Sequence, residues 1–374
     1  MASTRWLLML ILWLLPWMQM AKSGFSYQQF QSSPTWNTPM VIPKDGVYLI
    51  SLVVHPCESC PGIMKLYCQC QGKKAYFFTA HGELISGHAE VATGLKKKDK
   101  LILKNVGGLE SSSSISVVYV AELNSFYITV MNDLIWTKQS PVYYSIQLTP
   151  KGWISLKNPA LQATFRIPTT GMYWVTARPK TFLESITVSV RIKSKVLFTV
   201  YAENTKTVST SGAFCLAAGS EISMVTDGEV IYEPHTLLSL VYLAGNKKPN
   251  TYPFEHLAFT ADLGFSRSVV AQEVLQFKHV LTDYGYMYVD GYTEIRRTGS
   301  YMVSIRPDPE SSILVVVTLY VNGTFHWAIY AEEGVPVGAT ISLSLQAGSY
   351  LEVRSSKVSE LGTSTMFSIA FIQP

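Results

Sequence analysis

The sequence predicts an all-β protein made of three tandem jelly-roll β-sandwiches. Two observations carry this prediction. Short runs rich in Val, Ile, Tyr, Phe and Thr alternate with polar residues and end at Gly, Pro, Asn or Ser, a pattern typical of half-buried strands. A set of three sequence anchors also recurs three times in the same order. No long stretch has a helical period.

The first anchor is a turn that leads into a strand. It covers 42–48, 167–173 and 295–301, and each copy reads Ile, three turn residues, Gly, one residue and Tyr. The glycines lie 125 and 128 residues apart, from Gly46 to Gly171 and from Gly171 to Gly299. An alternating or apolar run follows each copy, as expected for a strand.

Two further anchors follow at the same spacing. One covers 95–101, 216–222 and 345–351, and the other is the closing strand at 117–120, 240–243 and 369–372. A solenoid repeat runs about 20 to 50 residues. A period near 125 residues is instead the size of a whole domain. Because each copy holds several short antiparallel runs, we predict a sandwich or jelly roll in each.

The amino-terminal segment predicts secretion. Arg5 precedes an apolar run at 6–18, and Ala21-Lys22-Ser23 offers small residues for cleavage. We therefore expect a signal peptide at 1–23, with an uncleaved anchor as the alternative, and no later membrane span. The predicted domains are 24–123, 124–245 and 255–374.

Composition narrows the function classes. The chain is 48% hydrophobic and 15% charged, with a formal charge of +4 over 374 residues. Disordered chains and coiled coils carry much more charge. Nucleic-acid-binding proteins concentrate basic residues on one face, so no nucleic acid is expected as a partner.

Five cysteines are unevenly placed. Cys57, Cys60, Cys68 and Cys70 lie within 14 residues, and Cys215 stands alone in an apolar run. In a secreted protein the first four predict local disulfides, and the alternative is a zinc knuckle. Cys215 is expected to be a buried thiol that packs as a small hydrophobe.

The third copy resembles a C1q globular domain. The resemblance rests on five segments of the third copy, namely 257–261, 277–285, 299–301, 322–323 and 366–371. The first two copies resemble tumour necrosis factor (TNF) homology domains equally well. The first copy is degenerate, since it lacks a clear first strand and has Lys98 in place of Gly before Asp99.

This resemblance implies a jelly roll of the TNF/C1q type and a trimeric assembly. Three copies on one chain suggest an intramolecular pseudo-trimer, with a homotrimer of three chains as the alternative. Aromatic side chains of the anchors are candidates for the interface between domains, although they could instead fill each domain's own core. These candidates are Tyr48, Tyr173, Tyr301, Tyr119, Tyr242 and Phe371.

The sequence contains no recognisable catalytic motif, so we expect no enzyme activity and no cofactor. His81 and His88 flank a Gly-rich loop and are interpreted as surface histidines rather than metal ligands. Some C1q-like heads bind calcium through loop carboxylates, which makes Asp283 and Asp290 candidates in the third copy. Asn322 begins the sequon Asn-Gly-Thr and is a predicted glycosylation site or a plain hairpin turn.

The most concentrated charge is a basic loop. Lys96, Lys97, Lys98 and Lys100 surround Asp99 and are expected to be solvated or to contact an acidic partner. The function predicted from all of these features is a secreted, non-enzymatic ligand that binds a cell-surface receptor or another extracellular partner. The alternatives are a soluble lectin-like protein that binds glycans or microbial surfaces, and a structural component of an extracellular coat.

Overall fold

A computed structural model shows an all-β chain in antiparallel sheets, which confirms the predicted fold class. None of the residues that the structure describes form a helix that could cross a membrane. The signal-peptide prediction and the cysteines Cys57 and Cys60 lie outside the described residues. The described ranges are 26–30, 39–55, 62–70, 73–82, 86–107, 113–121, 127–132, 146–149, 152–155, 164–181, 185–202, 208–226, 236–245, 257–285, 288–310 and 314–373.

The first third of the chain forms two four-stranded sheets. One sheet has the order β1-β8-β3-β6, and the other has the order β2-β7-β4-β5. The strands of the first sheet are β1 (Ser26–Phe30), β8 (Ser114–Ala121), β3 (Gly46–Val54) and β6 (Gly87–Leu95). Those of the second are β2 (Met40–Val41), β7 (Lys100–Gly107), β4 (Gly62–Cys70) and β5 (Lys73–Gly82). β1 pairs with β8, which corrects the expectation that this copy lacks a clear first strand.

The second third repeats this strand order. Its larger sheet runs β11-β10-β9-β18-β13-β16, and its smaller sheet runs β12-β17-β14-β15. The larger sheet holds β9 (Tyr127–Asn132), β10 (Ile146–Thr149), β11 (Gly152–Ser155), β13 (Gly171–Arg178), β16 (Thr210–Leu216) and β18 (Thr236–Gly245). The smaller one holds β12 (Phe165–Arg166), β14 (Ile186–Ile192), β15 (Lys195–Ala202) and β17 (Glu221–Val225).

The last third again has the same order. Its sheets run β21-β19-β30-β24-β27 and β22-β23-β28-β25-β26, with β20 paired to β29 beside them. The first sheet holds β19 (Ala258–Asp262), β21 (His279–Tyr284), β24 (Gly299–Arg306), β27 (Ala339–Leu345) and β30 (Met366–Gln373). The remaining strands are β20 (Arg267–Val269), β22 (Tyr288–Val289), β23 (Tyr292–Glu294), β25 (Val315–Val321), β26 (Thr324–Ala331), β28 (Tyr350–Ser355) and β29 (Ser359–Leu361). We call the three sheet pairs the first, second and third sandwich.

Each sandwich encloses its own apolar core, and the repeated tyrosine lies in it. The hydroxyls of Tyr48, Tyr173 and Tyr301 each donate to the carbonyl four residues earlier, at 2.8, 2.6 and 2.6 Å. Each ring also makes an edge-to-face contact with the aromatic residue of the closing strand. The partners of the three tyrosines in these ring contacts are, in order, Tyr119, Tyr242 and Phe371.

These six aromatic residues were candidates for the interface between domains, and the structure corrects that expectation. All six lie in or against the cores of their own sandwiches. Successive side chains of a strand point to opposite faces. The residues beside the tyrosines therefore point the other way, out of the sandwich.

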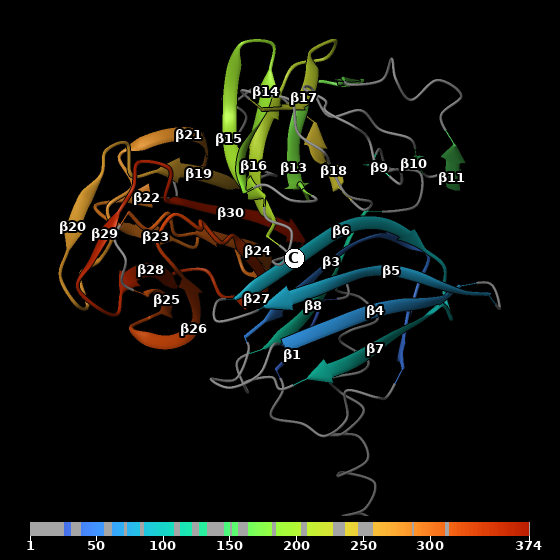
Figure 1. Ribbon diagram of the computed structural model, residues 1–374, viewed down its shortest axis with the longest axis horizontal. Helices are drawn as coiled ribbons and strands as arrows, with labels where there is room; N and C mark the ends of the chain where they lie inside the picture. Colours follow the sequence, from blue (N-terminus) through green and yellow to red (C-terminus); the bar gives the residue numbers. More distant parts are fainter. Residues whose placement is uncertain are drawn as a thin grey trace, which may run out of the picture.

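Those neighbouring residues form a fourth cluster that all three sandwiches share. The first sandwich contributes Leu49 from β3, the second Trp174 from β13 and the third Met302 from β24. Figure 1 shows the three groups of strands, blue to teal, green to yellow and orange to red, arranged around a common centre. β6 of the first sandwich contacts the second sandwich, β16 of the second contacts the third, and β27 of the third contacts the first. The three sandwiches thus meet in a closed ring of contacts between corresponding strands.

The turn between β6 and β7 contains the basic loop. Lys98 has a φ of 75°, and Gly219 and Gly348 have φ of 79° and 85° in the corresponding turns. The backbone N–H of each of these three residues donates to an Ile carbonyl, Ile42, Ile167 or Ile295. A lysine therefore occupies a left-handed position at which the other two copies have glycine.

Replacing Lys98 by glycine is expected to stabilise the chain by about 1 kcal/mol, because a residue with a Cβ is strained at positive φ. Urea unfolding would measure this gain. Lys97→Gly, one residue earlier in the same exposed loop, is the matched control and should be neutral or destabilising. Equal effects of the two substitutions would contradict the assignment of strain to Lys98.

Candidate functional site

The interfaces between sandwiches contain three corresponding hydrogen bonds. In each, a backbone N–H on the edge strand of one sandwich donates to a serine hydroxyl on the closing strand of the next. Ala92 N–H donates to Ser239 at 3.2 Å, Ala213 N–H to Ser368 at 3.0 Å and Ser342 N–H to Ser116 at 3.3 Å. These bonds join the first sandwich to the second, the second to the third and the third back to the first.

The serines and the donors occupy matching registers. Ser116 pairs with Ser51, Ser239 with Thr176 and Ser368 with Ser304 across the neighbouring strand. In all three copies the hydroxyl residue stands three positions before the aromatic residue of the closing anchor. The interface bonds are therefore part of the repeat.

One ionisable group breaks this symmetry at the centre. Glu90 on β6 is fully buried, and the second and third sandwiches have Ser211 and Thr340 at the same register. Three donors from the second sandwich reach its Oε1: Trp174 Nε1 at 2.8 Å, Thr176 Oγ1 at 2.5 Å and Ser211 Oγ at 3.0 Å. Glu90 thus anchors the first sandwich to the second.

His88 extends this polar centre to all three sandwiches. Its Nε2 lies 2.9 Å from Ser51 Oγ, and its Nδ1 lies 2.7 Å from Ser209 Oγ of the second sandwich. Ser51 donates its own proton to the carbonyl of Thr340 in the third sandwich at 2.7 Å. His88 Nδ1 also lies 3.2 Å from the Ser209 carbonyl, so the ring contacts the second sandwich directly and the third through Ser51.

Burial shifts the pKa values of both Glu90 and His88. It raises the pKa of Glu90, against the lowering effect of hydrogen bonds from Thr176, Trp174 and Ser211. It also lowers the pKa of His88 to about 4. Glu90 Oε2 lies 3.8 Å from His88 Nε2. Desolvation opposes the charged form of each group, because few waters or counter-charges can reach it.

A second buried histidine lies where the first sandwich meets the third. His55 Nδ1 lies 2.7 Å from Ser86 Oγ, which accepts from Tyr330 N–H of the third sandwich at 3.2 Å. The rings of His55 and Tyr330 meet edge to face at 5.2 Å. Burial lowers the pKa of His55 to about 3.

Acid should therefore weaken this contact through His55. A histidine whose folded pKa is depressed contributes stability that is present above its ordinary pKa of 6.5 and is lost as the pH falls toward 3. The expected loss is about 2 kcal/mol at pH 5. Urea unfolding between pH 8 and pH 5 should show a flatter profile for His55→Gln than for the wild type. His326→Gln, at an exposed histidine of β26, is the control and should keep the wild-type slope.

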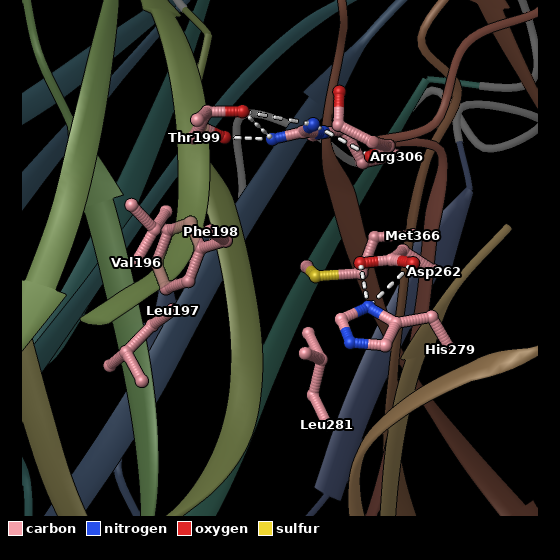
Figure 2. A pocket seen from close by; sticks show the side chains of 10 residues that line it. Val196, Leu197, Phe198, Thr199, Asp262, His279, Leu281, Arg306 and Met366 are labelled. Atoms are coloured by element: carbon pink, nitrogen blue, oxygen red, sulfur yellow. Dashed lines mark hydrogen bonds and ion pairs between the residues drawn. The ribbon is translucent and has the colours of Figure 1, made fainter. Parts of the chain in front are cut away.

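A pocket of about 210 Å³ lies in the groove between the second and third sandwiches. Figure 2 shows Val196, Leu197 and Phe198 of β15 on one side. Leu281 and Met366 of the third sandwich face them across the groove. Leu197, Phe198 and Met366 are buried in one apolar cluster, and Val196 is the strongly exposed apolar side chain of the lining.

Polar side chains surround this apolar lining. Arg306 donates to the carbonyl of Thr199 in the second sandwich and to the carbonyl of Ser364 at 2.6 Å. On the other side, His279 Nδ1 lies 3.0 Å from the Asp262 carboxylate, and the His279 side chain is exposed. Arg306 holds the two sandwiches together, and the His279 ring of the His279–Asp262 pair is open to solvent.

The predicted cysteine sites have mixed outcomes. Cys68 and Cys70 form a disulfide within β4. With Asp99 they are the one group of three metal-ligand types close together in the described ranges, but disulfide sulfurs are not thiolate ligands. Cys215 is exposed and accepts from the Tyr284 hydroxyl at 3.1 Å, which corrects the expected buried thiol. Phe214, beside it on β16, faces the core, so Cys215 points to the opposite face, toward the third sandwich.

The other predicted residues are placed as follows. Lys96, Lys97, Lys98 and Lys100 are exposed. Asp283 and Asp290 are also exposed, and no group of metal ligands that includes either was found in the described residues. His88 is fully buried, which corrects the interpretation as a surface histidine, while the His81 side chain lies outside the described residues.

Comparisons with known proteins identify no family. No protein-family model and no curated sequence matches the chain. A solved Eiger TNF from S. frugiperda is 16% identical, with 26% of this chain and 89% of that chain covered and a TM-score of 0.18. PNGF-II is 9% identical, with 84% and 98% covered and a TM-score of 0.26.

The tandem CBM22 domains of Paenibacillus barcinonensis Xyn10C are 11% identical, with 56% of this chain and 81% of that chain covered and a TM-score of 0.19. Because these TM-scores are low, the likenesses carry no argument about function. The TNF/C1q assignment stays a prediction that rests on the sequence motifs.

Proposed function

We propose that the protein is a secreted, non-enzymatic binding protein whose three sandwiches form, within one chain, the three-fold assembly of TNF/C1q-like proteins. The observation that carries this proposal is the ring of three corresponding hydrogen bonds from Ala92, Ala213 and Ser342. Each sandwich uses its edge strand toward one neighbour and its closing strand toward the other. A ring of this kind leaves no unpaired interface for further assembly.

The buried carboxyl group of Glu90 supports an assembly built from one copy of each of the three sandwiches. Glu90 has its donors on the second sandwich, whereas three copies of the first sandwich would bring three Glu90 carboxyl groups together at one axis. Burying like charges together without partners is strongly unfavourable. Within the single chain, Glu90 Oε1 accepts from three side chains of the second sandwich, whereas Glu90 Oε2 has no hydrogen-bond partner among the described residues.

A single-chain ring has three different grooves, unlike a homotrimer. The groove between the second and third sandwiches is the best candidate for the partner site. Its apolar lining fits an aliphatic or aromatic side chain of an extracellular or cell-surface protein, and His279 and Asp262 at its rim fit a polar group beside that side chain.

The assembly is tested by the mass of the secreted protein in solution. Light scattering should give the mass of one chain. A mass near three chains would overturn the single-chain ring and would favour three stacked homotypic trimers.

The groove is tested by cell binding of the labelled protein. Val196 is 41% exposed, and Val196→Glu places a charge in the apolar lining, so saturable binding to cells should weaken at least tenfold. Val41→Glu is the matched control, since Val41 is a 51% exposed strand valine of the first sandwich. Unchanged binding of Val196→Glu would overturn the groove assignment. Binding that is lost when cell-surface glycans are removed enzymatically would favour the lectin-like alternative.

A further inference from the structure

An exposed aromatic patch covers one end of the outer face of the third sandwich. It consists of Tyr292 on β23, Tyr320 on β25, Phe325 on β26 and Tyr350 on β28. Phe325 is 55% exposed, Tyr292 42% and Tyr350 38%. Figure 1 shows these strands side by side in the orange and red part of the chain. Aromatic side chains exposed to this extent on adjacent strands usually mark a surface that something covers.

The rings of the patch are paired. Tyr320 and Phe325 meet edge to face at 6.1 Å, and Tyr292 and Tyr350 do so at 6.0 Å. Arg354 lies over the Tyr320 ring at 4.6 Å and pairs with Glu352. These contacts hold the rings in place while one side of the patch stays open to solvent.

The sequon lies at the edge of this patch. Asn322 and Gly323 form the turn between β25 and β26, with φ of 51° and 74°. Both residues have positive φ, which is typical of a two-residue hairpin of type I′. Tyr320 precedes Asn322 by two residues, and Phe325 follows it by three and pairs with Tyr320 across the hairpin.

The Asn322 side chain bonds to the start of β28, next to the Tyr350 ring of the patch. Its Oδ1 accepts from Tyr350 N–H at 2.9 Å, and its Nδ2 makes a long contact of 3.4 Å to Ser349 Oγ. A Cβ on Gly323 would lie 3.7 Å from the Tyr350 hydroxyl, so the Tyr350 ring reaches the turn. The short bond uses Oδ1, which leaves an N–H of the exposed amide for a glycosidic bond. A sugar on Nδ2 would start beside these rings.

We propose that Asn322 carries an N-linked glycan whose first sugar packs on the aromatic patch and covers it. The C–H faces of an N-acetylglucosamine ring are apolar and suit the electron-rich faces of Tyr and Phe. The first sugar of the glycan thus covers the exposed rings of the patch permanently. The proposal requires that the chain enters the secretory pathway, as the amino-terminal segment predicts, and does not depend on the groove.

The first part of the test is the mass of the full chain made in a eukaryotic cell with its own leader. We expect one N-linked glycan, removed by an amidase that cleaves such glycans and absent from Asn322→Gln. An unmodified Asn322, whether the chain is secreted or retained, overturns the proposal.

The second part asks whether the sugar packs on the patch. The glycosylated chain, trimmed to a single N-acetylglucosamine, should melt about 2 to 4 °C above Thr324→Val, which lacks the sequon but keeps Asn322 in the turn. That difference should vanish when Phe325 and Tyr350 are both replaced by Thr, and it should persist in Val41→Thr, at an exposed valine of the first sandwich. A glycan effect that is equal with and without the two rings would leave the glycan but overturn its contact with the patch.

Discussion

Replacing Trp174 by alanine is expected to destabilise the folded chain by about 4 kcal/mol, because a buried tryptophan leaves a large cavity. Trp174 is 1% exposed and lies in the cluster that all three sandwiches share. The substitution also removes a donor to Glu90. Urea unfolding followed by circular dichroism would measure the loss.

Two further variants separate the causes of this loss. Trp174→Phe keeps most of the apolar volume and removes the donor to Glu90, so it should cost about 1 to 3 kcal/mol. Trp327→Ala removes a tryptophan from the core of the third sandwich alone. Calorimetry should show that Trp174→Ala uncouples the melting of the three sandwiches, whereas Trp327→Ala lowers the third. A cost below 1 kcal/mol for Trp174→Ala would contradict the shared cluster as a source of stability.

Replacing Glu90 by alanine should cost about 3 kcal/mol or more, since several buried donors would lose their acceptor. Glu90→Gln keeps an acceptor oxygen and cannot ionise. Burial raises the pKa of Glu90 above its ordinary value of 4.5, so the stability tied to this group is fully present below that value. It is lost as the pH rises through the raised pKa.

The stability of Glu90→Gln relative to the wild type should therefore increase with pH above 4.5, by up to about 1.4 kcal/mol per pH unit. Unfolding free energies measured from pH 4.5 to pH 8.5 would show this trend. Glu294→Gln, at an exposed carboxylate of β23, is the control and should run parallel to the wild type. A constant difference between Glu90→Gln and the wild type would show that burial does not raise the Glu90 pKa.

His88 and His55 act in the opposite direction to Glu90. Because the pKa values of His88 and His55 are lowered, acidification decreases the free energy of unfolding through these two residues. Protonation of Glu90 in the folded chain increases it, because the pKa of Glu90 is raised. The pH profile of the wild type is the sum of these opposing contributions. Single substitutions are therefore more informative than the wild-type profile alone.

The repeated anchors could be recognised in the sequence because their residues are set by the geometry of the local backbone. A side chain at Gly46 would lie 2.2 Å from the Tyr119 ring, which explains why the anchor has glycine there. The tyrosine that follows bonds to a carbonyl only four residues away. Strand patterns and turns of this kind depend on neighbouring residues, so they predict the fold class from sequence.

The interface between sandwiches could not be assigned in the same way. β3 is buried along its whole length, so alternation does not show which face meets a neighbouring sandwich. The sequence did contain a signal, since Ser116, Ser239 and Ser368 recur three residues before the closing aromatic residue. A serine on a strand is usually exposed, and only its partner on another sandwich shows that it is buried for a hydrogen bond.

The amino-acid sequence by itself determined the all-β class, the antiparallel strands and the period of the repeat, because strand propensity and turn chemistry are local. The tertiary structure decided which residues face the shared centre, the burial of Glu90 and His88, and the exposure of Cys215. These properties depend on atoms far apart in the chain: Glu90 and its donor Trp174 are 84 residues apart. Desolvation and packing arise only when such segments meet.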